Sequence, residues 1–175
     1  TCALPILTLT GKSCGAEERA PMCGVPYHAV EGYLNKLVAN GHKVAICEQV
    51  EDPKLAKGLV KREVIRIVTP GTNTDMQALD ESKNNYIMCI VYLADKYGIS
   101  LADISTGDYF VTEVDTERKL IDEINKFAPS EIICNESFYM SGVDLSDMKN
   151  RLGIAVYSLE AWYFSDETAE IGRAS

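Results

Sequence analysis

Residues Asn85–Val114, NYIMCIVYLADKYGISLADISTGDYFVTEV, decide the fold of the second half of this 175-residue chain. The stretch contains three runs rich in apolar and β-branched residues, at 85–94, 98–105 and 108–114. Such runs are typical of β-strands, and the few polar and glycine residues between them suit tight hairpin connections. The stretch therefore predicts an antiparallel meander of three strands.

A helix and a fourth strand are expected directly after the meander. Asp115 is interpreted as the helix N-cap, apolar residues recur at helical spacing over Leu120–Phe127, and Pro129 ends the pattern. Ser130–Cys134 is then expected to return as a strand beside the meander. A further helix at 144–152 and a further strand at 154–158 are also expected.

The first part of the chain predicts a smaller mixed α/β unit. Apolar side chains share one helical face over Ala29–Ala39, and Asn40-Gly41 ends that helix. Lys12–His28 is expected to be a loop. Strands are expected at Leu7–Thr10, Lys43–Val50 and Glu63–Val68.

The boundary between the two parts is expected where Pro, Gly, Asn and Asp interrupt both periodicities, over residues 69–75. The predicted organisation is a first unit at 1–70, a linker at 71–84 and a second unit at 85–175. Residues 1–6, TCALPI, and 170–175, EIGRAS, match the translations of a sequencing-library adapter and of its reverse complement. We therefore expect both ends to be artefactual and the native part to be roughly 7–169.

The formal net charge of −9 is divided unevenly. Residues 1–75 hold nine Lys and Arg against eight Asp and Glu, a charge of +1, whereas residues 76–175 hold eight against eighteen, a charge of −10. Only the first part is suited to phosphate, and the second is better suited to protein contacts. A basic cluster in the first part is either a phosphate-contacting patch or a solvated face. It consists of Lys54, Lys57, Lys61, Arg62 and Arg66.

The composition favours a cytoplasmic protein without a membrane span. The longest apolar run, Tyr86–Ala94, is far shorter than the ~20 residues that a spanning helix needs. The six cysteines form no Cys-x-x-Cys pair and are interpreted as buried, reduced thiols. A zinc site from Cys14, Cys23 and His28 is the weaker alternative, because its spacing matches no usual structural site.

Three motifs in order carry a resemblance to one family. They are MCGVPYHAVEGYLNKLV at 22–38, KVAICEQVEDP at 43–53 and KREVIRIVTPGT at 61–72. Together they resemble the DNA mismatch repair protein family MutS, from the later part of its mismatch-recognition domain into its connector domain. The resemblance implies a remnant of the small mixed α/β recognition domain, followed by a truncated RNase H-like connector.

The resemblance also implies where DNA would be contacted. Lys12 matches a basic position that contacts the DNA backbone, and Met22, Cys23 and Gly24 match a turn near the backbone and minor groove. Lys61 and Arg62 are the members of the basic cluster proposed to contact phosphate. The family's mismatch-wedging Phe-x-Glu pair does not occur in this sequence.

A structural role is the alternative for part of this motif. In that interpretation Met22, Val25 and Tyr27 belong to the core, while Pro21 and Pro26 rigidify a loop. For Tyr27 and His28 the structural role is preferred.

Catalysis is not expected of this chain. Nucleases of the RNase H-like fold gather carboxylates around metal ions, and the acids available are Asp103, Asp108, Asp122 and Glu123. We expect Asp108 to serve a turn, and Asp122 and Glu123 to lie on the exposed helix face, so no metal site is predicted. The phosphate-cradling Gly-x-x-x-x-Gly-Lys-Ser/Thr motif does not occur either.

The resemblance implies the remaining partners. The parent would bind mismatched double-stranded DNA as a homodimer, recruit a MutL-type protein, and use ATP and Mg²⁺ in a domain outside this chain, which itself needs no cofactor. The alternative is an acidic RNase H-like protein-interaction module that does not bind DNA.

Overall fold

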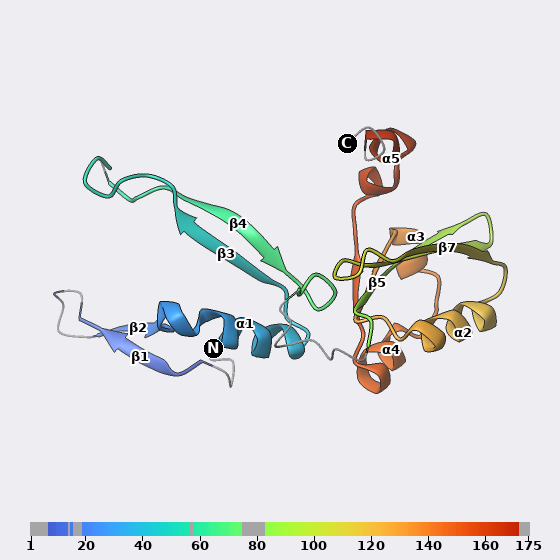
Figure 1. Cartoon of the computed structure of the whole chain (residues 1–175), viewed down its shortest axis with the longest axis horizontal. Helices are drawn as coiled ribbons and strands as arrows, with labels where there is room; N and C mark the ends of the chain where they lie inside the picture. Colours follow the sequence, from blue (N-terminus) through green and yellow to red (C-terminus); the bar gives the residue numbers. More distant parts are fainter. Residues whose placement is uncertain (1–6, 14, 16–18, 57, 75–82, 172–175) are drawn as a thin grey trace. The chain divides into compact units, whose positions relative to one another are not determined.

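The computed structural model describes residues 7–13, 15, 19–56, 58–74 and 83–171, and these form two units (Figure 1). The first unit spans Thr1–Val68 and the second Thr69–Ser175. Residues 1–6 and 172–175, which include most of the predicted artefactual ends, lie outside the described part, as do residues 75–82 of the predicted linker. The predicted domain bounds stay predictions.

The first unit begins with a two-stranded antiparallel hairpin, β1 (Leu9–Lys12) and β2 (Ala20–Cys23). The strand expected near Leu7–Thr10 is therefore present with a shifted start, but the prediction of a loop throughout Lys12–His28 is wrong. Pro21 favoured a loop, yet proline is tolerated on an edge strand because its missing N–H need not serve a ladder. The Thr10 hydroxyl donates to the carbonyl oxygen of Met22 at 2.8 Å and ties the two strands.

A helix and a second hairpin complete the first unit. The short 3₁₀ turn η1 (Tyr27–Ala29) leads into α1 (Val30–Ala39), which ends at Asn40 and Gly41, where Gly41 has φ of +77°. The two strands expected here are present as β3 (Val44–Gln49) and β4 (Arg62–Val68), and they pair antiparallel. The buried residues Leu34, Val38 and Val68 form the core of this unit, with Val44 and Ile46 packed against them.

The second unit contains a five-stranded sheet in the order β7-β6-β5-β8-β9. The meander is confirmed, because β6 pairs antiparallel with β5 and with β7, and β8 then returns parallel to β5. The strand β9 pairs parallel with β8. The bounds are β5 Tyr86–Leu93, β6 Lys96–Asp103, β7 Tyr109–Val114, β8 Glu131–Cys134 and β9 Ala155–Ser158.

The main helix, α2 (Glu117–Phe127), begins one residue later than expected. Its N-cap is Thr116, whose hydroxyl accepts the Lys119 N–H, so the assignment of the cap to Asp115 is wrong. Asp115 instead pairs with the Lys119 ammonium at 2.7 Å. The other helices are α3 (Glu136–Tyr139), α4 (Leu145–Leu152), the 3₁₀ turn η2 (Ala161–Phe164) and α5 (Asp166–Ile171), of which only α4 was expected.

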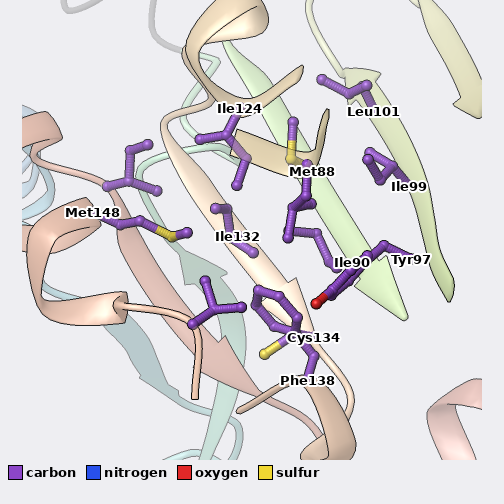
Figure 2. Close-up of a cluster of buried hydrophobic side chains, with 13 residues drawn as sticks. Met88, Ile90, Tyr97, Ile99, Leu101, Ile124, Ile132, Cys134, Phe138 and Met148 are labelled. Carbon is purple, nitrogen blue, oxygen red and sulfur yellow. The ribbon is translucent and has the colours of Figure 1, made fainter. Parts of the chain in front are cut away.

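The core of the second unit gathers side chains from the sheet and from α2, α3 and α4 (Figure 2). Alternate residues of β5 and β6 are buried, because successive side chains of a strand point to opposite faces. The buried residues are Met88, Ile90, Tyr97, Ile99, Leu101, Leu120, Ile124, Ile132, Cys134, Phe138, Val143, Met148 and Ile154. Within the described ranges, no helix is both long and apolar enough to cross a membrane.

Candidate nucleic-acid interface

The β1–β2 hairpin carries Lys12 and Met22 on one of its faces. Met22 lies opposite Thr10, and Lys12 lies opposite Ala20, two residue pairs farther along the ladder. Cross-strand partners share a face, and so do alternate residues of one strand, so Lys12, Thr10 and Met22 are on the same side. Lys12 is exposed and 42% of the Met22 surface is accessible, which places a cation and an adaptable apolar side chain side by side.

Cys23 and Gly24 belong to a different surface. Cys23 lies opposite Leu9 and therefore faces away from Met22. Together with Gly24 it lines an apolar pocket of about 210 Å³ beside α1. A Cβ added at Gly24 would meet no atom within 4 Å, so the space next to this backbone is open.

The second candidate surface is the β3–β4 hairpin with Lys61 and Arg62. The Lys61 ammonium pairs with the Glu63 carboxylate at 2.6 Å, and both side chains are more than half exposed. Exposed pairs of this kind contribute about 0–1 kcal/mol, so Lys61 exchanges its partner at small cost. Arg62 lies exposed opposite Gln49, and among the described residues no carboxylate forms an ion pair with it.

A β-bulge divides the basic cluster between two faces. Ile46 pairs with Arg66 whereas Cys47 pairs with Val64, so Ile65 is the extra residue of β4. Arg66 therefore shares the face of Ile46, while Arg62 shares the opposite face with Gln49. Arg66 also lies 3.9 Å from the Glu31 carboxylate. Of the other members, Lys57 lies outside the described residues, and the Lys54 N–H is bonded to the Asp52 side chain.

The structure corrects the interpretation of Tyr27 as a core residue and exposes His28, for which a structural role was also preferred. Tyr27 is 90% exposed, and His28 is exposed as well. Tyr27 follows Pro26 at the start of η1, where its side chain lines an open groove together with Glu31 and Arg66. Sequence reasoning also passed over Arg19, whose guanidinium donates to the Gly11 carbonyl oxygen across the β1–β2 hairpin. The sequence feature that could have pointed to Arg19 is its position as a single cation between two segments that contain glycine.

The buried carboxylate Asp103 is held by four hydrogen bonds in the second unit. Its Oδ2 accepts the Asn85 N–H at 3.0 Å, and its Oδ1 accepts the Ser105 N–H at 2.8 Å, the Ser105 hydroxyl at 2.6 Å and the Thr106 N–H at 3.3 Å. Burial by itself raises the pKa of Asp103, but the bonds from Ser105, Asn85 and Thr106 outweigh it and leave the pKa below its ordinary value. Asp103 therefore ties the end of β6 to the start of β5.

The other acids considered for metal binding are engaged separately. Asp108 accepts a hydrogen bond from the Asn84 amide at 3.2 Å, and its backbone closes the turn with Asp103. Asp122 is exposed, as expected, but the Glu123 side chain is only a quarter exposed and pairs with Lys126 at 3.2 Å. Over the described residues, no group of three His, Cys, Asp or Glu side chains is arranged to hold a metal ion.

The cysteines differ from the expectation of uniformly buried thiols. Cys134 is buried and Cys89 half-buried, whereas Cys23 and Cys47 are exposed, so the prediction is wrong for these two. Burial, with a smaller effect of the neighbouring Cys89, raises the pKa of the Cys134 thiol to about 11. Burial also raises the pKa of Cys89, although a hydrogen bond with Ser100 opposes it.

Two successive family matches agree with this two-unit arrangement. The description MutS domain I matches residues 4–77, and MutS domain II matches residues 85–172. The chain therefore belongs to the MutS family, and the predicted fold class of a small mixed α/β unit followed by a connector-type domain is confirmed.

Relatives named DNA mismatch repair protein MutS match almost the whole chain. The protein of Lachnoclostridium phytofermentans is 64% identical over 161 residues, which cover 92% of this chain and 17% of the relative. That of Acetivibrio thermocellus is 53% identical over 164 residues (92% and 19%), and that of Clostridium tetani 50% over 171 residues (97% and 19%). The chain thus spans less than a fifth of the length of these relatives.

Proposed function

We propose that this chain supplies a DNA-contacting surface and an acidic connector to a mismatch repair protein. The observation that carries the proposal is the membership of both units in the MutS family, in the order of its domains I and II. The first unit would contact the DNA backbone through the face that bears Lys12 and Met22. The second unit, where most of the negative charge resides, would relay between the DNA and other parts of the whole protein.

The whole protein would supply the remaining activities. We infer that it binds mispaired double-stranded DNA as a homodimer, binds ATP and Mg²⁺ in a domain outside this chain, and recruits a MutL-type partner. Complementary charge on the connector would affect the rate of that association and the choice of partner more than its affinity. The exposed Asp122 of α2 is the acid best placed to contribute.

The 175-residue chain by itself is expected not to distinguish mismatched from matched DNA. A wedging side chain favours a mispair because a weakly stacked step costs less to open, and this sequence lacks the Phe-x-Glu pair. Binding should therefore be non-specific, with a Kd of about 10⁻⁴ to 10⁻⁶ M or weaker, and should weaken as salt rises.

The test is a fluorescence-anisotropy titration of the chain with matched and mismatched duplexes between 20 and about 200 mM salt. Lys12→Gln should weaken both duplexes alike, whereas the matched control Lys149→Gln, an exposed cation of the second unit, should leave binding unchanged. A tenfold preference for the mispair would contradict the expected lack of discrimination. No binding at 20 mM salt would instead favour an interaction module that does not bind DNA.

The connector is proposed to act by contact and relay, without chemistry of its own. Asp103 is occupied by four hydrogen bonds from its own unit, which leaves it poorly suited to ligate a metal. The chain should therefore not cleave DNA or RNA/DNA hybrids with Mg²⁺ or Mn²⁺. Cleavage that Asp103→Asn abolishes would overturn this part of the proposal.

A further inference from the structure

A tight turn follows directly after the last strand of the first unit. The Thr72 N–H donates to the Thr69 carbonyl oxygen at 3.2 Å, and the Thr69 N–H donates to the Thr72 hydroxyl at 2.7 Å. Thr69 and Gly71, which lie in the segment predicted as the boundary between the two units, are buried. The turn belongs to the second unit, which begins at Thr69.

Asn85, at the start of β5, holds this turn from the other side. Its side-chain amide is directed at three carbonyl oxygens, those of Pro70 at 3.0 Å, Asn73 at 3.2 Å and Gly71 at 3.4 Å. Its side-chain oxygen Oδ1 accepts a hydrogen bond from the Ser130 hydroxyl, and its backbone N–H donates to the Asp103 carboxylate. Asn85 is 9% exposed, so the loss of these partners would leave polar groups unsatisfied in the interior.

Gly71 packs against the sheet too closely for any other residue. An added Cβ would lie 2.3 Å from Cγ1 of Ile87 and 2.9 Å from Cγ of Glu131. The buried Glu131 also accepts the Gly71 N–H at 3.3 Å. The segment from Thr69 to Asn73, named here the clasp, is therefore fixed on the second unit by both packing and hydrogen bonds.

The clasp begins at the residue that directly follows the last strand of the first unit. Its far end is held at the start of β5, because the Asn85 side-chain amide donates to the Asn73 carbonyl oxygen at 3.2 Å. Val68 is buried in the core of the first unit, and Thr69 is buried in the second.

We propose that the pivot between the two units is the Val68–Thr69 peptide, and that Asn85 is the positioning residue that fixes the clasp. A movement of the first unit on DNA would then be transmitted to the second unit through the clasp. The proposal rests on contacts within the second unit and holds whether or not the chain binds DNA.

Paired insertions test where the pivot lies. Two glycines are inserted between Val68 and Thr69 in one variant, and between Ala78 and Leu79 in the other. NMR residual dipolar couplings of backbone amides then give an alignment tensor for each unit separately. The first insertion should change the relation between the two tensors, and the second should leave it as in the unmodified chain. A change from the second insertion, or no change from either, would overturn the proposal.

Amide relaxation tests the role of Asn85. In the unmodified chain Gly71, Thr72 and Asn73 should have order parameters of about 0.85, typical of rigid backbone. Asn85→Asp keeps the shape and the acceptor for Ser130 but removes the amide donors, so these order parameters should fall while the β5–β8 amides keep their chemical shifts. The matched control Asn125→Asp, at an exposed position of α2, should leave the clasp rigid. Values below about 0.6 in the unmodified chain would refute the clasp.

Discussion

The two units differ in how they are stabilised. Among the residues that the structure describes, three form the buried core of the first unit, whereas thirteen form that of the second. In the first unit, β4 exposes about half the surface of Val64, Ile65 and Ile67. Apolar burial contributes roughly 25 cal/mol per Å² to the free energy of unfolding. The second unit has the larger buried core, so its core contributes more to stability than that of the first unit, which leaves a larger share of its apolar side chains exposed.

The largest effect is expected from emptying the core of the second unit. Phe138 is fully buried, and its ring packs edge-on against the Tyr97 ring with 6.2 Å between the ring centroids. Phe138→Ala should lower the free energy of unfolding of this unit by about 3–5 kcal/mol, measured by urea denaturation followed by circular dichroism. Its neighbour Tyr139 is half exposed, so Tyr139→Ala should cost less than about 0.5 kcal/mol.

A truncation to alanine in the core of the first unit tests whether the two cores are packed differently. Leu34 is buried, but it also lines the apolar pocket beside α1. Leu34→Ala should therefore cost only about 2 kcal/mol, the low end for such changes, because an existing hollow is enlarged rather than a close-packed site emptied. An equal loss for Leu34→Ala and Phe138→Ala would show that the two cores are equivalent.

Thiol reactivity should separate the units. At pH 8 the rise of the Cys134 pKa from its ordinary value of 9.0 to about 11 lowers the thiolate fraction of Cys134 roughly a hundredfold, and the thiolate is the nucleophile. Iodoacetamide should therefore label Cys134, which is also buried, much more slowly than the exposed Cys23 and Cys47. Tryptic peptide mapping by mass spectrometry measures each rate, and comparable rates would mean that the second unit opens readily.

The sequence predicted the connector better than the first unit, for a physical reason. Period-two burial in β5 and β6 and the helical stripe of α2 are strong local signals, and the elements that they predicted are confirmed. The edge strand β2 was missed because Pro21 usually marks a loop. The cap was assigned to Asp115 instead of Thr116 because either side chain can accept a free N–H at the start of a helix, so the sequence does not distinguish them.

The candidate interface depended on features that spacing does not encode. The bulge at Ile65 places Arg62 and Arg66 on opposite faces, although residues four apart in a regular strand share one. Tyr27 is exposed at the start of η1, directly after the extended Pro26, and its apolar ring gave no sign of this in the sequence. Long-range contacts such as those of Asn85 with the clasp bring together residues more than ten positions apart, which no local pattern reveals.

Asp103 makes the stability of the second unit dependent on pH. Its pKa is lower in the folded state than the ordinary value near 3.9, so it stabilises the unit fully above that value and progressively less as pH falls through the folded pKa. Asp103→Asn should cost about 1.5–3 kcal/mol at pH 7, because its amide group opposes one of the present donors. The free energy of unfolding of this variant, measured by urea denaturation from pH 6 to 2, should also depend less on pH than that of the unmodified chain. An unchanged profile would contradict this role for Asp103.

The smallest effect is expected at the basic residues of the β3–β4 hairpin, where the first unit would meet phosphate. Each phosphate contact contributes a slope of about −0.9 to the dependence of log K on log salt, or roughly a threefold change in affinity between 50 and 200 mM salt. Arg62→Gln should remove about one such contact for matched and mismatched duplexes alike. Lys61→Gln should change the slope less, because Lys61 must first leave Glu63.

The partner of Lys61 provides the control. Glu63→Gln removes the carboxylate that competes for Lys61. In that background, adding Lys61→Gln should change the salt slope by as much as Arg62→Gln changes it in the unmodified chain. The salt titration that tests Lys12 measures all four variants. Slopes that do not differ among them would show that this hairpin is a solvated face, and the proposal of a DNA-contacting surface would then rest on the face of Lys12 and Met22 alone.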